Sequence, residues 1–86
     1  MKKIDRITEQ YPDETFLVAD GFDRAILGVY FDTFGDNPVR LVYSVKKCLQ
    51  ILMKDMSEED AREYFEFNTR GGYVGEQTPI WVDDEY

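Results

Sequence analysis

The side chains that could do chemistry in this chain are one cysteine, many carboxylates and a group of glycines. Histidine, the commonest general base and a frequent metal ligand, does not occur in the sequence. Cys48 falls on the apolar side of an expected helix, whereas a nucleophilic thiol needs exposure and an activating base. In a chain this acidic, pairs of carboxylates at short spacing are expected by chance. We therefore expect Cys48 to be a core residue and the protein not to be an enzyme.

Two further patterns resemble ligand sites. Asp32, Asp36 and Asn37 offer oxygen ligands, but they lack the alternating spacing of a calcium loop. Residues 71–75 (GGYVG) are rich in glycine, yet they follow an expected helix, whereas a dinucleotide-binding loop follows a strand and opens a helix. A helix C-terminus also presents carbonyls, which repel phosphate. We expect turns at these glycines and at Asp20-Gly21, and we expect no metal and no cofactor.

The carboxylates matter more through their total charge. Eighteen acidic residues oppose 10 basic ones, which gives a formal net charge of −8. The acids concentrate in residues 55–66 and 76–86. Such a surface repels nucleic acid and anionic lipid and attracts basic partners. Two interpretations stay open: the acids imitate a phosphate backbone in a basic groove of another protein, or they only keep the domain soluble.

The length and the single cysteine limit the cell compartment and the domain count. Eighty-six residues form one small domain, residues 1–86, in which residues 1–15 are expected to be a loose arm or a first turn. One cysteine cannot form an intramolecular disulfide, which favours the reducing cytoplasm. The N-terminal lysines precede no apolar run of the kind found in a signal peptide, and no stretch reaches the roughly 18–20 apolar residues of a membrane span. We expect a soluble cytoplasmic protein.

The local patterns predict an α+β fold. Residues 25–31 and 39–43 read as two strands of a hairpin, whose tip 32–38 is rich in turn residues. Ser44 is expected to cap a helix with an apolar stripe, and Ser57 is expected to cap a second helix. The expected inner face of the second helix comprises Ala61, Tyr64, Phe65 and Asn68.

The last part of the chain is expected to end the second helix and return to the sheet. Gly71 and Gly72 are expected to end the second helix, and residues 79–82 are expected to form a closing strand that begins with proline. Together these elements predict a small, mainly antiparallel sheet of three to four strands with a two-helix unit packed on one face.

Several blocks of the chain also match a known pattern. They read DGFD at residues 20–23, AILGV at 25–29, KCLQILM at 47–53 and EYFEFN at 63–68. Over about residues 20–82 the chain resembles small proteins encoded mostly by bacteriophages, with the pattern DGFDxAIIGV…KCIEILM…EEAxEYFEFN…AYVGExTP. Gly72 departs from the alanine that is common there. The resemblance implies a phage or prophage setting, and because the family has no established activity it transfers no site residue.

Apolar residues are expected on both faces of the sheet, although the helices would cover only one face. If Leu27, Val29 and Phe31 face the helices, alternation turns the residues between them to the opposite face. The residues expected on that open face are Ile26, Tyr30, Val42 and Trp81. This face is too apolar for plain exposure to solvent. Three covers stay open: the N-terminal arm, a second copy of the chain, or a partner protein.

These observations predict a non-enzymatic protein that binds and modulates a host protein, as an anti-defence inhibitor or a nucleic-acid mimic. The acidic residues expected to contact the partner are Glu59, Glu63, Glu66, Asp83, Asp84 and Glu85. The open sheet face would supply aromatic anchors or self-association. Two alternatives stay open: a homo-oligomer that binds a small molecule or nucleotide near Tyr73 and Trp81, or a structural or housekeeping phage component.

Overall fold

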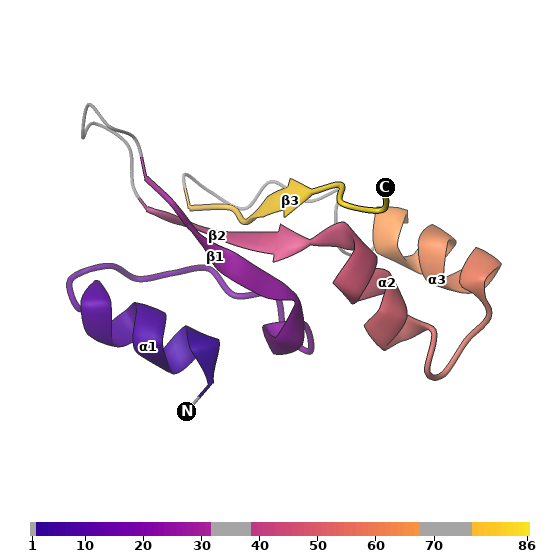
Figure 1. Cartoon of the computed structure of the whole chain (residues 1–86), viewed down its shortest axis with the longest axis horizontal. Coiled ribbons are helices and arrows are strands. Elements are labelled where there is room, and N and C mark those ends of the chain that lie inside the picture. Colours follow the sequence, from indigo (N-terminus) through magenta and orange to yellow (C-terminus); the bar gives the residue numbers. More distant parts are fainter. Residues whose placement is uncertain (1, 32–38, 68–76) are drawn as a thin grey trace.

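The structure is a computed structural model that describes residues 2–31, 39–67 and 77–86. Within these residues, three α-helices, one short 3-10 helix and a three-stranded sheet form an α+β fold, as the sequence predicts (Figure 1). The elements are α1 (Lys3–Gln10), the 3-10 helix η1 (Asp23–Ala25), β1 (Ile26–Tyr30), β2 (Arg40–Ser44), α2 (Val45–Leu52), α3 (Glu58–Phe65) and β3 (Ile80–Val82).

The sheet has the order β1-β2-β3 and is mixed. β1 and β2 pair antiparallel, which confirms the predicted hairpin, whose tip 32–38 lies outside the described residues. β3 is the predicted closing strand, and it pairs with β2 in parallel. The reason is that parallel neighbours need a crossover connection, and α2 and α3 lie in the segment that joins β2 to β3.

A β-bulge in β1 decides which residues enter the core. Ile26 pairs with Tyr43, but Gly28 already pairs with Val42, so Leu27 is the extra residue. Ile26 is therefore 1% exposed and Leu27 41% exposed. The predicted orientation of these two residues was wrong, because strict alternation cannot anticipate an inserted residue.

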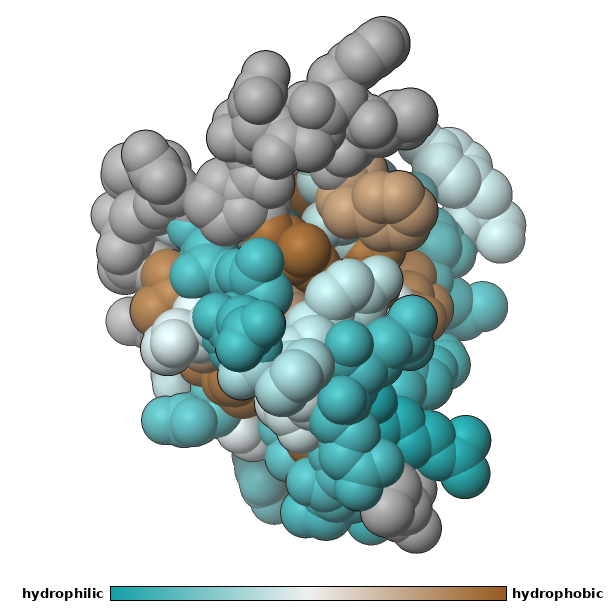
Figure 2. Space-filling view, turned by 90° about the vertical axis from the view of Figure 1, so that its left-hand side faces the viewer, coloured by the Kyte–Doolittle hydropathy of each residue, from teal (hydrophilic) through white to brown (hydrophobic). Residues whose placement is uncertain are grey.

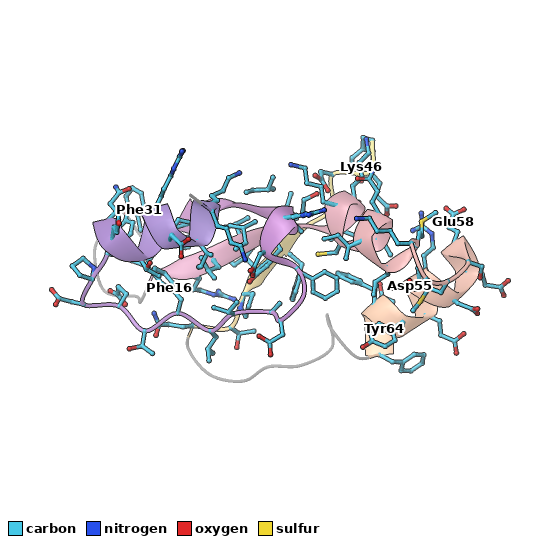
Figure 3. The ribbon with its side chains drawn as sticks, turned by 90° about the horizontal axis from the view of Figure 1, so that it is seen from below. Phe16, Phe31, Lys46, Asp55, Glu58 and Tyr64 are labelled. Atoms are coloured by element: carbon cyan, nitrogen blue, oxygen red, sulfur yellow. The ribbon has the colours of Figure 1, made fainter. Side chains whose placement is uncertain are left out.

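The inner face of the sheet is covered by the segment that joins α1 to η1. This segment runs below the strands in Figure 3, with Phe16 labelled on it and Lys46 on the opposite side. The Ala19 backbone N–H donates a hydrogen bond of 2.9 Å to the hydroxyl of Tyr43, which is fully buried. Residues 3–10, expected to be a loose arm or a first turn, form α1, which buries Ile7 in the core. The N-terminal part of the chain thus contributes to the core.

Gly21 forms the turn that leads into η1. The Phe22 N–H bonds to the Ala19 carbonyl at 3.2 Å, and Gly21 has a φ of 87°, as in position three of a type II turn. The predicted turn at Asp20-Gly21 is confirmed.

Gly21→Ala is expected to lower the free energy of unfolding by about 1 kcal/mol, because a Cβ is unfavourable at this positive φ. Space is not the cause, since an added Cβ meets nothing within 4 Å. Gly28→Ala is the matched control, because Gly28 has equal space and no positive φ. Urea denaturation of both variants measures the difference. Equal losses in the two variants would contradict a turn that requires a positive φ at position 21.

Two serines start α2 and α3 as predicted. The Ser44 hydroxyl accepts a 3.0 Å hydrogen bond from the Lys47 N–H, and the Ser57 hydroxyl accepts one of 3.2 Å from the Asp60 N–H. These bonds satisfy backbone donors that have no partner within the helix. The predicted end of α3 at Gly71 and Gly72 lies outside the described residues.

Candidate protein-binding surface

The open face of the sheet retains only part of its expected apolar set. Parallel pairing places Trp81 opposite Tyr43 on the inner face, not on the open one. Its ring centroid lies 5.1 Å from that of Tyr43 and 5.4 Å from that of Phe65. Trp81 is half-buried and packs against the core, and Ile26 is fully buried, so two of the four expected open-face residues face the core. Tyr30 remains 48% exposed and Val42 half-buried.

The end of the molecule away from α3 is mixed in character. Figure 2 shows hydrophilic residues over much of its lower half, and hydrophobic residues mainly in the upper half beside the residues drawn in grey. The strand-end residues Tyr30 and Phe31, which are 48% and 59% exposed, immediately precede segment 32–38. The apolar end of the hairpin therefore adjoins a part of the chain outside the described residues.

The acids of the C-terminal tail are engaged within the protein. The Ser44 hydroxyl donates a 2.5 Å hydrogen bond to Asp84, and the Lys46 N–H donates one of 3.0 Å to the other carboxylate oxygen. The hydrogen bond from Ser44 lowers the pKa of Asp84 below its usual value, and the hydrogen bond from Lys46 lowers it further by a smaller amount. Asp84 thus fastens the tail to the start of α2, which differs from its expected role in contacting a partner.

Glu85 is engaged in the same way with α3. Arg62 lies 2.7 Å from Glu85 and 3.2 Å from Glu58, and the hydrogen bond from Arg62 lowers the pKa of Glu85. Asp83 accepts a 3.3 Å hydrogen bond from the Glu85 N–H. Asp84 and Glu85 thus have partners within the protein, and the prediction that the three tail acids contact a partner protein stays a prediction.

Cys48 is a core residue, as predicted. It is 0% exposed, and burial, with a smaller effect from the nearby charge of Asp84, raises the pKa of its thiol to about 12. The thiol is therefore protonated near neutral pH, whereas a nucleophile requires the thiolate.

The other candidate ligands are not assembled in the part of the chain that is described. Within residues 2–31, 39–67 and 77–86, no group of three or more His, Cys, Asp or Glu side chains could hold a metal ion. The candidate cation ligands at 32–37, the glycine loop 71–75 and Tyr73 lie outside these ranges.

A surface that combines acids with exposed aromatic rings lies on α3 and beside both of its ends. Met56, Asp60, Glu63, Tyr64 and Phe67 line a shallow pocket of about 390 Å³. Tyr64 is 45% exposed and Phe67 79% exposed. Tyr64 was predicted on the inner face of this helix, but only Ala61 and Phe65 of that set are buried among the described residues. Asn68 lies outside them.

The periodicity of the helix explains this arrangement. Asp60 and Tyr64 are four residues apart and lie on one side of α3, and Phe67 follows in the π-helical residues just beyond its end. The predicted contact residues Glu59, Glu63 and Glu66 are exposed and form a second row. The second row lies about 100° round the helix, since each residue advances by that angle. Figure 3 shows Tyr64 on the lower side of α3 and Glu58 on the upper side. We call these two rows together with Met56 and Phe67 the α3 surface.

Comparison of the chain with protein-family models, curated proteins and solved structures finds no match. No helix in the described ranges is both long and apolar enough to cross a membrane.

Proposed function

We propose that this protein is a non-enzymatic binding protein whose α3 surface docks a basic segment of a partner protein. The observation that supports this most strongly is the row of exposed acids beside the exposed rings of Tyr64 and Phe67, around a shallow pocket. Aromatic side chains supply much of the energy at protein interfaces, whereas charges at the rim supply orientation and fast association.

The partner's chemistry follows from this surface. Lysine or arginine side chains would lie against Glu59 and Glu63, and an apolar side chain would enter the pocket beside Tyr64. The pocket itself also contains Asp60 and Glu63, so a cation next to the apolar side chain is favoured. Glu66 already interacts within the protein, so in this proposal it lies at the edge of the contact with the partner.

The setting is part of the proposal. The resemblance of residues 20–82 to small phage proteins supports a role in the cytoplasm of an infected bacterium. The partner would then be a host protein with a basic groove, such as a defence or nucleic-acid-handling factor. The acidic row would occupy that groove in place of a phosphate backbone, and so modulate the factor.

Capture from a bacterial lysate tests the surface when it is done with matched variants. The test variant is Glu63→Lys with Tyr64→Ala, and the control is Glu9→Lys with Tyr30→Ala. Both pairs reverse one exposed charge and remove one exposed ring, but the control changes α1 and the open sheet face. We expect a basic protein that the wild type and the control retain, that the test variant loses, and whose capture weakens with salt. Equal capture by the test variant, loss by the control alone, or no salt-sensitive capture by the wild type would contradict the proposal.

A further inference from the structure

A second, larger pocket shares no lining residue with the α3 surface. It has a volume of about 740 Å³ and is formed where the start of α1, the Gly21 turn, η1 and the end of α2 meet. Figure 1 shows η1 between α1 and α2, so three segments far apart in sequence meet here.

The charge of this pocket is opposite to that of the whole protein. Its lining contains the cationic residues Lys2, Lys3, Arg24 and Lys54 and a single carboxylate, Asp23. The chain as a whole has a net charge of −8, so four of its 10 basic residues gather at one place. This concentration provides a local positive field that an anion would enter.

The cations are only partly used inside the protein. The Lys2 ammonium lies 4.0 Å from Asp23, and Lys3 donates a 3.0 Å hydrogen bond to the Ile26 carbonyl. Within the described residues, no carboxylate forms an ion pair with Arg24 or Lys54. These two side chains come from η1 and from the turn after α2, and they are exposed and able to donate to a ligand.

The pocket also has an apolar wall. The half-buried Ile51 supplies this wall, and a ligand that carried only charge would leave it uncovered. The volume lies within the range of about 300–1,000 Å³ that is typical of small-molecule sites. Arginine and lysine together are the residues that bind phosphate oxygens, by a bidentate fork and by a point charge.

We infer that this pocket binds a small phosphate ester, with the phosphate at Arg24 and Lys54 and the organic group against Ile51. The site does not depend on the proposed function, because none of its residues belongs to the α3 surface.

Titration followed by the amide signals of the isotope-labelled protein tests this inference. The probes are inorganic phosphate, phenyl phosphate and adenosine monophosphate, each with the wild type. The test variant is Arg24→Gln with Lys54→Gln. The matched control is Lys46→Gln with Lys47→Gln, which removes two exposed cations of α2 that do not line the pocket. Unchanged spectra outside the substituted positions show that both variants fold.

We expect saturable shifts of pocket amides with at least one ester, and tighter binding of that ester than of inorganic phosphate. The test variant should bind it about tenfold more weakly, and the control within about twofold of the wild type, since each charge-assisted hydrogen bond contributes directly to affinity. Three results would overturn the inference: neither ester moves the pocket amides, neither binds more tightly than phosphate, or both variants lose affinity equally.

Discussion

Replacing Trp81 with alanine is expected to lower the free energy of unfolding by about 3 kcal/mol, the low end for loss of a tryptophan from a core. The ring packs against Tyr43 and, edge to face, against Phe65, so its removal leaves space between β2, β3 and α3. Urea denaturation measures the loss directly. In a domain of this size the melting temperature should fall by more than about 10 °C.

Val82→Thr is the control for this prediction. Val82 lies next to Trp81 in β3 and is 38% exposed, and threonine keeps the branched Cβ that favours a strand. We expect a loss of about 0.5 kcal/mol, as for surface substitutions in general. If Trp81→Ala were no more damaging than this control, Trp81 would lie on the open face of the sheet after all.

Replacing Asp84 with alanine is the second large effect, at about 2 kcal/mol. The substitution removes two hydrogen bonds to a carboxylate, from the Ser44 hydroxyl and the Lys46 N–H, and leaves the fully buried Ser44 without this acceptor. Asp83→Ala is the matched control, because Asp83 is exposed and bonds only to the nearby Glu85 N–H among the described residues. Chemical denaturation should show a clear loss for Asp84→Ala and little change for Asp83→Ala.

The Asp84 effect should depend on pH in a defined direction. The hydrogen bond from Ser44 lowers the pKa of Asp84 in the folded protein, so its contribution is fully present above the unfolded pKa of about 3.9. It is lost as the pH falls through the folded pKa. The difference in stability between wild type and Asp84→Ala should therefore be constant from about pH 5 to 7 and shrink below about pH 4. A difference that grows on acidification would contradict the stabilising hydrogen bonds to the ionised Asp84.

Local signals in the sequence predicted much of the fold. Ser44 and Ser57 act through donors three residues away, so both helix starts are visible in a short window. The hairpin and the turn at Asp20-Gly21 are local in the same way. The bulge at Leu27 is not visible in a short stretch of sequence, because it is defined only by the pairing of β1 with β2. The same limit applies to Trp81, whose direction is set by its parallel register with Tyr43.

The residues of the candidate sites also differ in whether a short stretch of sequence could reveal them. The exposure of Glu59 and Glu63 follows from the period of a single helix, and the sequence predicted it. The engagement of Asp84 depends on a contact with Ser44 across 40 positions, which no window of sequence contains. The basic pocket was missed for the same reason, since Lys3, Arg24 and Lys54 meet only in the folded chain.

Photo-crosslinking from single positions tests the central claim, that the α3 surface is where a partner docks. One variant carries p-benzoylphenylalanine in place of Phe67 and the other carries it in place of Tyr30, on the open sheet face; both side chains are exposed. Each is irradiated in a bacterial lysate, and crosslinked proteins are identified by mass. We predict a light-dependent crosslink to a basic protein from position 67 and none to that protein from position 30. A crosslink from position 30 with none from position 67 would contradict the account.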